Sequence, residues 1–345
     1  MRKLKVMVVD DSALIRMIVG DMISQHDDLE LIATAKDGLE AIEKLKSIHP
    51  DVISLDIEMP NMDGLDTLEI IQERYQIPVI MLSSLTERNS KYTLEALGKG
   101  AYDFIEKPSS SIALDRVRDE LYEKIASVRY INQASDGQRK INQKVRSETE
   151  PPFHPSQHHF KAIAIGASTG GPKSLTEIIR RIPKNKYSIP IFVVQHMPKG
   201  FTKHFAERLD RLCYQKVKEA EDGETICNGT IYIAPGDYHM TIHGNLIRLD
   251  QRERYLGVRP AVDYLFQSAA ETYGEGLLSI LLTGMGRDGT EGMRATRRLK
   301  GVNIAQDEET SVIFGMPGSA IKSGVVDYVL SLEEISMQIN KIIER

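Results

Sequence analysis

Short apolar runs alternate with helix-like segments over the first 128 residues, and this spacing constrains the fold more than any other feature. The runs are Leu4–Val9, Leu29–Ala35, Val52–Leu55, Ile77–Leu82 and Tyr102–Ile105. Such short runs suit buried strands, and the segments between them are long enough for crossover helices. The alternation predicts an α/β domain in which five parallel strands form a doubly wound sheet.

A chain of 345 residues is long for one core, and its composition divides it into two parts. Between residues 129 and 158 the periodicity fades and Asn, Gln, Ser, Lys and Pro become frequent, which predicts an exposed linker. The alternation then resumes with Ala162–Ile165, Ile189–Val194, Thr230–Ala234 and Leu277–Leu282. We therefore predict one domain at residues 1–128, a linker at 129–158 and a second doubly wound α/β domain at 159–345.

Polar side chains follow four of the five strands predicted in the first domain. They are Asp10 and Asp11 after the first strand, Asp56 at the third, Ser83 and Ser84 at the fourth, and Lys107 at the fifth. Taken singly, each fits an ordinary helix cap or turn. The carboxyl ends of parallel strands share one edge, however, and three carboxylates there would repel one another without a cation such as Mg²⁺. One carboxylate could then attack a phosphoryl donor.

A glycine-flanked serine follows the first strand of the second domain. Residues 166–171 read Gly-Ala-Ser-Thr-Gly-Gly and fit the G-x-S-x-G elbow, a strand-to-helix turn that exposes its serine. The glycines fit a tight packing turn equally well, so the motif alone leaves both alternatives open. Two later strand ends favour the elbow because they carry His196 and Asp288. A serine needs a base for its proton, and a carboxylate behind the histidine orients the ring.

Two glycine turns, at residues 170–171 and 284–286, could supply the backbone N–H groups of an oxyanion hole. Other histidines compete less well with His196 for the role of base. His204 falls in a helix-like segment and His239 and His243 lie near a turn, so we expect all three on the surface or at helix ends. The linker histidines at 154, 158 and 159 are expected to be solvated, since no other metal ligands lie at fixed spacing around them.

Charge and apolar patterning argue against several classes of protein. The net charge is −5, divided into −9 over residues 1–128 and +2 over both 129–158 and 159–345, so the second domain has no strong basic footprint for nucleic acid. No apolar run approaches the ~20 residues of a membrane helix and no secretory signal begins the chain, so we expect a cytoplasmic protein without membrane insertion. Cys213 and Cys227 lack metal or disulfide spacing.

The first domain resembles the receiver domain of two-component response regulators, on the acidic, hydroxyl and lysine positions just described. The resemblance implies a flavodoxin-like fold and makes Asp56 the phosphorylation site. It implies a Mg²⁺ site formed by Asp10, Asp11, Asp56 and the backbone carbonyl of Glu58. By the same resemblance Ser83 and Lys107 contact the phosphoryl group, and Phe104 occupies the position of the family's switch aromatic.

The second domain resembles the methylesterase domain of the chemotaxis protein CheB. The motifs that carry the resemblance are Gly166–Gly171, Gln195–Pro198 with Gly200–Thr202, Ile233–Asp237, Pro260–Asp263 and Leu282–Gly289. It implies that Ser168, His196 and Asp288 form a catalytic triad. It further implies that Met285 supplies a backbone oxyanion donor and that Thr169 lines the site.

Together the two resemblances imply a phosphorylation-activated hydrolase of chemotaxis. Its substrates would be glutamate methyl esters on methyl-accepting chemoreceptors, with methanol released, and in some members receptor glutamines, which are deamidated. The chemotaxis histidine kinase would donate the phosphoryl group, Mg²⁺ would serve the receiver, and ester hydrolysis would need no cofactor. In the family the unphosphorylated receiver covers the esterase site.

Two alternatives belong to other functional classes. In the first, the second domain binds DNA as in a transcriptional regulator, which would make DNA retention sensitive to salt. In the second, the protein is a non-catalytic adaptor that docks on receptors and is switched at Asp56. The adaptor predicts no ester hydrolysis by the native chain.

Overall fold

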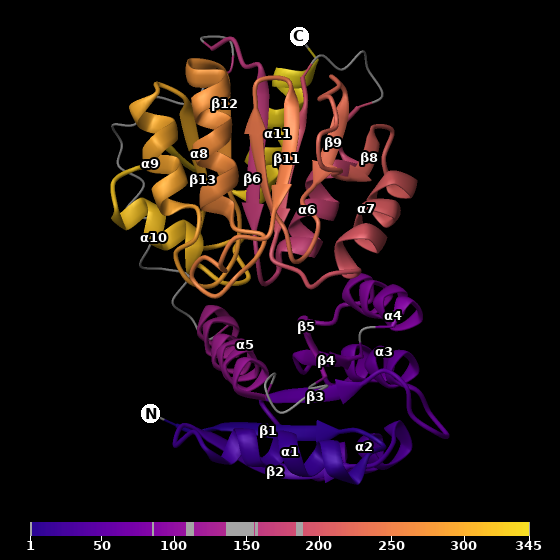
Figure 1. Ribbon diagram of the computed structural model, residues 1–345. Helices are drawn as coiled ribbons and strands as arrows, with labels where there is room; N and C mark the ends of the chain where they lie inside the picture. Colours follow the sequence, from indigo (N-terminus) through magenta and orange to yellow (C-terminus); the bar gives the residue numbers. More distant parts are fainter. Residues whose placement is uncertain are drawn as a thin grey trace. The chain divides into compact units, whose positions relative to one another are not determined.

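The computed structural model describes residues 2–84, 86–107, 114–135, 155, 158–183 and 189–344. Its internal contacts divide the chain into two compact units, Met1–Gln138 and Arg139–Arg345 (Figure 1). The middle of the predicted linker, with His154, lies outside the described residues, and the domain boundaries expected from the sequence stay a prediction.

The N-terminal unit contains a five-stranded parallel sheet in the order β2-β1-β3-β4-β5. Its strands are β1 (Leu4–Val9), β2 (Leu29–Ala35), β3 (Val52–Asp56), β4 (Val79–Ser83) and β5 (Asp103–Glu106). Its helices are α1 (Ala13–Ser24), α2 (Gly38–Leu45), α3 (Gly64–Arg74), α4 (Glu87–Gly98) and α5 (Leu114–Ser135). The five predicted strands are present with ends shifted by at most two residues, and this strand order is flavodoxin-like, so the predicted fold class is confirmed.

Side chains at the loop ends determine where four of these helices begin. Ser12, Asp37, Asp63 and Thr86 each accept a hydrogen bond from the backbone N–H three residues further on. Strand order reverses between β1 and β3, which are direct neighbours. The carboxyl ends of these two strands therefore flank the crevice where ligands bind in sheets of this kind.

The C-terminal unit contains a seven-stranded parallel sheet in the order β14-β13-β12-β6-β7-β9-β8. Its strands are β6 (Ala162–Ala167), β7 (Ile191–Gln195), β8 (Lys216–Glu219), β9 (Thr230–Ile233), β12 (Leu277–Leu281), β13 (Val302–Gln306) and β14 (Tyr328–Leu330). A separate antiparallel hairpin joins β10 (His239–His243) to β11 (Leu246–Asp250). The helices are α6 (Gly171–Arg180), α7 (Phe201–Leu212), α8 (Val262–Tyr273), α9 (Thr290–Arg298), α10 (Met316–Lys322) and α11 (Leu332–Ile343), with the short 3-10 helix η5 (Gly274–Gly276).

Five strands of this unit were not predicted, because their sequences lack a clean apolar run. β8 reads Lys-Val-Lys-Glu at the sheet edge, and β14 has three residues. β13 is buried throughout but carries Asn303 and Gln306 among its apolar residues. Both amides bond to backbone groups of neighbouring loops, and Asn303 also to a carbonyl of α9, which is why they are tolerated inside the core.

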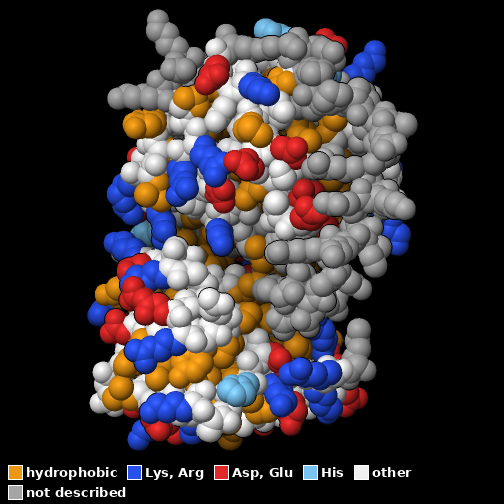
Figure 2. Space-filling model, turned by 180° about the vertical axis from the view of Figure 1, so that it is seen from behind, with side chains coloured by type: hydrophobic (Ala, Val, Ile, Leu, Met, Phe, Trp, Pro, Cys, Tyr) orange, Lys and Arg blue, Asp and Glu red, His pale blue; other side chains and the backbone are white. Residues whose placement is uncertain are grey.

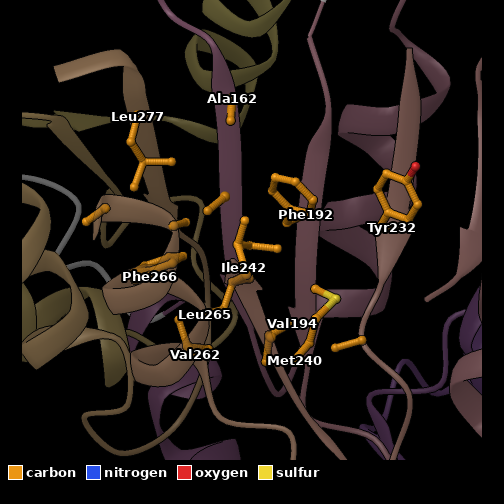
Figure 3. Packing of buried hydrophobic residues seen from close by; sticks show 14 of the residues in the cluster. Ala162, Phe192, Val194, Tyr232, Met240, Ile242, Val262, Leu265, Phe266 and Leu277 are labelled. Atoms are coloured by element: carbon orange, nitrogen blue, oxygen red, sulfur yellow. The ribbon is translucent and has the colours of Figure 1, made fainter. Parts of the chain in front are cut away.

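α8 and the β10–β11 hairpin pack against one face of the seven-stranded sheet. Figure 3 shows this core, formed by Val262, Leu265 and Phe266 of α8, Met240 and Ile242 of β10, and Ala162, Phe192, Val194, Tyr232 and Leu277 of the strands. A Cβ at Gly166 would lie 2.3 Å from a methyl carbon of Val262, so glycine is required for α8 to approach β6 this closely. The first turn of α8 is thereby held near the end of β6, one residue before Ser168.

The surface carries charges of both signs. On the face seen in Figure 2, Lys and Arg side chains are interspersed with Asp and Glu side chains on each unit. Among the described residues, no helix combines the length and the apolar character that crossing a membrane requires.

Candidate active site

Ser168 lies at the switch point of the seven-stranded sheet, where strand order reverses between β6 and β12. Its backbone N–H donates to the carbonyl of Thr283, which follows β12, at 3.0 Å. Its own carbonyl accepts from Gly171 at 2.7 Å, closing a turn in which Gly170 has a φ of +78°. Ser168 is half-buried, and its hydroxyl makes no hydrogen bond with a described residue. This turn presents the serine hydroxyl at the carboxyl edge of the sheet.

His196 and Asp288 form a hydrogen-bonded pair, with His196 Nε2 2.8 Å from Asp288 Oδ2. Asp288 is buried and also accepts from the backbone N–H groups of Val262 at 2.7 Å and Asp263 at 2.9 Å. Burial alone would raise the pKa of Asp288, but the His196 hydrogen bond and charge, with the two backbone donors, hold it below its usual value. Asp288 is therefore a carboxylate, and Nδ1 is the ring nitrogen that remains for another partner.

The Ser168 and His196 turns are joined by Gln195, the last residue of β7. Its buried side-chain amide donates from Nε2 to the carbonyl of Ser168 at 3.0 Å and to that of His196 at 3.2 Å. The backbone N–H of His196 in turn donates to the carbonyl of Ala167 at 3.1 Å. These bonds bring the predicted nucleophile and the predicted base onto adjacent strand ends. No hydrogen bond between Ser168 Oγ and the His196 ring is present among the described residues.

The loop after β12 lies directly against the serine. A Cβ at Gly284 would stand 2.8 Å from Ser168 Cβ, so a side chain there would displace the serine. The buried Thr283 hydroxyl lies 3.0 Å from the Thr169 carbonyl and accepts from the N–H of Ile313 at 2.9 Å. The two strand ends are thus held together by backbone contact as well as by side chains.

Several backbone N–H groups at this edge have no bonded acceptor among the described residues, those of Gly170 and Gly286 included. Within the described part of the chain, the N–H groups of Thr169 and Met285 donate to no other group. Those of Gly171 and Gly284 are already bonded, to the carbonyls of Ser168 and Ile313. Both glycine turns considered from the sequence therefore keep an unbonded N–H group, at Gly170 in the first and at Met285 and Gly286 in the second.

The N-terminal unit has a second polar site, at the switch point between β1 and β3. Oxygens of Asp10, Asp11 and Asp56 all lie within 4.8 Å of one another. Lys107 Nζ lies 2.8 Å from both Asp10 Oδ2 and Asp56 Oδ1. Burial raises the pKa of Asp56 to about 6, although the Lys107 ammonium opposes this shift. A cluster with only oxygen donors suits a hard divalent cation.

Three further residues that the receiver resemblance implies, Ser83, Phe104 and Glu58, differ in burial and in their contacts. Ser83 is fully buried, and its hydroxyl lies 2.8 Å from the Thr93 hydroxyl of α4. Phe104 is buried, with the Lys124 ammonium 5.2 Å from its ring centre. The Glu58 side chain is exposed, 3.9 Å from Arg88, so its predicted role would fall to its backbone carbonyl alone.

Both parts of the chain match models of known protein families. The family model described as CheB methylesterase matches residues 163–339, and that of the response regulator receiver domain matches residues 6–118. The chain belongs to the CheB methylesterase family. The resemblance seen in the sequence is thereby confirmed for both parts of the chain.

CheB relatives in distant organisms match the chain along its length. Proteins named protein-glutamate methylesterase/protein-glutamine glutaminase from Pyrococcus abyssi and Thermotoga maritima are each 44% identical, over 99% of this chain and 94% and 99% of their own lengths. The crystal structure of the Thermotoga maritima CheB methylesterase catalytic domain is 46% identical, with a TM-score of 0.52, and covers 53% of this chain and 99% of its own. The similarity therefore extends from sequence to fold.

Two histidines of this CheB family member are not where the sequence analysis expected them. His239 is fully buried on β10, with Nε2 3.1 Å from the Glu253 carbonyl and its ring edge-on to Tyr264. His204 is buried on α7, 3.1 Å from Glu207. The expectation of surface positions was wrong for both because the hairpin and α7 pack onto the sheet. His243 is exposed as expected.

Sequence reasoning missed three residues that hold the site together: Gln195, Thr283 and Asp263. All three fall inside motifs that were recognised, but nothing in their type distinguished them from lining residues. Asp263 is buried on the first turn of α8 and accepts from the N–H of Gly292 at 2.6 Å. An acidic residue in a helical first turn is common, so only its burial beside Asp288 marks it.

Proposed function

We propose that the chain is a phosphorylation-activated serine hydrolase, a protein-glutamate methylesterase and protein-glutamine glutaminase, in which Ser168, His196 and Asp288 carry the reaction. The observation that carries this proposal is the 2.8 Å bond between His196 and Asp288 on the strand end beside the Ser168 turn. The names of the full-length relatives support the same activity.

The reaction divides into two acyl transfers. Ser168 Oγ attacks the ester carbonyl carbon while its proton passes to the His196 ring. Because Asp288 holds Nε2, Nδ1 is the nitrogen that receives this proton. The same proton then goes to the departing methoxide, which leaves as methanol, and a glutamyl-serine ester remains. Water, deprotonated by His196, cleaves that ester and restores Ser168; with a glutamine substrate the leaving group is ammonia.

The negative charge that develops on the carbonyl oxygen of the substrate must be stabilised by hydrogen-bond donors that are already in position. We assign this role to the Met285 N–H, with Thr169 lining the site and its N–H as a second donor. A missing donor in such a site costs roughly 10² to 10³-fold in rate. The support is that neither N–H donates to another described group. The chemistry assigned to these side chains requires no cofactor.

The N-terminal unit acts as the switch in this proposal. Asp56 is the phosphoryl acceptor, and Asp10, Asp11, Asp56 and the Glu58 carbonyl would hold Mg²⁺. Bound there, Mg²⁺ would supply positive charge toward the phosphoryl oxygens. Lys107, already 2.8 Å from Asp56, and Ser83 would contact the phosphoryl group. Phe104 would respond through its buried position beside β4.

The partners follow from the family. We propose methyl-accepting chemoreceptors as substrates and the chemotaxis histidine kinase as phosphoryl donor, both met in the cytoplasm. No role for nucleic acid or for direct membrane insertion is proposed.

The direct test is release of labelled methanol from methyl-labelled receptor by the full chain. We expect release by the native protein and a loss of at least roughly 10³-fold in Ser168→Ala, with receptor binding retained. Circular dichroism and thermal unfolding serve as controls for folding. Receptor binding without methanol release by the native chain would favour the adaptor alternative instead.

A further inference from the structure

Two buried carboxylates at the active site cap a pair of helices reciprocally: Asp288, just before α9, caps α8, and Asp263, in α8, caps α9. Asp288, two residues before the start of α9, accepts from the N–H groups of Val262 and Asp263 in the first turn of α8. Asp263, in that first turn, accepts from the N–H of Gly292 in the first turn of α9 at 2.6 Å. Neither helix has a side-chain cap at its own N-cap residue, Ala261 or Gly289. The N-terminus of each helix is therefore capped by a carboxylate from outside that helix, Asp288 for α8 and Asp263 for α9.

The two helix starts are in close contact. A Cβ at Gly292 would lie 2.5 Å from Phe266 Cβ and 3.1 Å from Asp263 Cα. Glycine thus allows the Asp263 carboxylate to reach the Gly292 N–H. The Asp288 carboxylate, which bonds His196, is consequently placed by a joint formed from α8 and α9.

The joint contains two carboxyl groups, and Asp288 ionises at a lower pH than Asp263. Asp288 receives the His196 bond, which favours its ionised form. Burial and the neighbouring Asp288 charge raise the pKa of Asp263 to about 7, opposed by the N–H groups of Gly292 and Gly289 and by the Tyr255 hydroxyl. The main titratable groups facing Asp263 are Asp288, from the loop before α9, and Tyr255, from the segment before α8, with His196 behind Asp288.

We propose that Asp263 is a positioning residue of the hydrolase: its bond to Gly292 holds Asp288 on His196, and its proton state controls how strongly the Asp288–His196 pair stabilises a charged imidazole. This inference rests on the proposed function. Below neutral pH Asp263 carries a proton and is a neutral acceptor. As pH rises through neutrality it becomes a second negative charge behind the ring, which favours the imidazolium formed when Ser168 attacks.

The matched variant is Asp263→Asn, which keeps one carbonyl oxygen for the Gly292 N–H but cannot ionise. We expect its kcat to match the native value at pH 6 and to fall roughly 3- to 10-fold below it at pH 8.5, because the variant lacks the second negative charge behind the imidazolium. KM should not change. Asp263→Ala, which removes the cap as well, should lose activity at every pH and unfold at lower temperature.

A second measurement does not depend on catalysis. In the full chain, the ring-proton NMR signal of His196, assigned with His196→Gln, should titrate at lower pH in Asp263→Asn than in the native protein. Should Asp263→Asn fail to fold, Tyr255→Phe is the substitute. Tyr255→Phe removes a hydrogen-bond donor to the ionised Asp263 and should therefore raise the pKa of Asp263 further. The increase in kcat with pH that we expect for the native protein should then occur at higher pH.

The outcomes separate this inference from the proposed function. A native-to-variant ratio that grows with pH, together with the shifted His196 titration, supports the inference. A ratio independent of pH with an unchanged titration overturns it. If the native chain hydrolyses no ester, the proposed function fails, and the His196 titration alone still decides whether Asp263 controls the pair.

Discussion

At the scale of single residues, Gln195 links the two turns that carry the proposed nucleophile and the proposed base. It occupies the end of a buried strand, where an amide has no obvious packing advantage over methionine or leucine. Its two donated bonds hold the carbonyls of Ser168 and His196, which come from different strands. In the proposed mechanism His196 would exchange protons, while Gln195 holds the backbone of the two neighbouring turns in place.

Replacing Gln195 with methionine tests this function, because methionine has similar length but donates no hydrogen bond. The carbonyls of Ser168 and His196 would each lose this donor, although Ser168 would keep that of Gly171, and the two turns would be free to separate. A misplacement of about 1 Å can cost roughly 10²-fold in rate, so we expect kcat to fall by about that factor while KM changes little. Steady-state kinetics with labelled receptor measure both. Gln267→Met, on the exposed face of α8, is the matched control and should leave kcat unchanged; an equal loss in both variants would contradict the proposed clamp.

At the scale of elements, the approach of α8 to α9 depends on a glycine inside a helix. Alanine normally stabilises a helix interior by up to about 1 kcal/mol over glycine. At Gly292 the added methyl would meet Phe266 Cβ at 2.5 Å, and forcing extra volume into a packed contact costs about 1–3 kcal/mol. The cost of packing the extra methyl group is larger than the gain in helix propensity, so we expect Gly292→Ala to destabilise the protein.

We therefore expect Gly292→Ala to lower the thermal unfolding temperature of the C-terminal unit and to reduce kcat by displacing Asp288. Gly318→Ala, in α10, provides the comparison because its nearest neighbours are ring carbons of Phe314 at 3.1 and 3.2 Å, which can move. Calorimetry should show a clearly larger decrease for Gly292→Ala than for Gly318→Ala. Equal unfolding temperatures would refute the close contact.

At the scale of the whole molecule, one chain carries the proposed phosphoryl-acceptor site and the proposed esterase site on separate sheets. Each lies at the switch point of its own sheet, so the same topological rule places two unrelated chemistries. Coupling between them requires that phosphorylation change the free-energy difference between a less active and a more active state.

A small acyl phosphate donor with Mg²⁺ should raise methanol release by the full chain. Typical coupling free energies correspond to roughly 5- to 150-fold, and we expect an increase in that range. Asp56→Asn should keep the basal rate and lose the response, and so should removal of Mg²⁺ with a chelator. Stimulation that persists in Asp56→Asn would place the acceptor elsewhere.

The sequence by itself determined the class of fold and the residues that could carry chemistry. Most strands are recognisable as apolar runs, and parallel strands bring their polar ends to one edge, so Asp56, Ser168, His196 and Asp288 could be placed at or after strand ends from spacing alone. Edge strands and strands with polar residues, such as β8 and β13, were not predicted. Pairing and loop contacts stabilise them, and no local apolar pattern marks them in the sequence.

Only the tertiary structure decided how these residues are held. Which nitrogen of His196 faces Asp288, which backbone N–H groups remain available, and why His239 is buried all depend on segments far apart in the chain. Asp263 shows the reason most clearly: its type and its helical position are ordinary, and its raised pKa comes from burial beside Asp288, 25 residues away along the chain. Local sequence encodes chemistry and periodicity, whereas burial and electrostatic environment are properties of the packed whole.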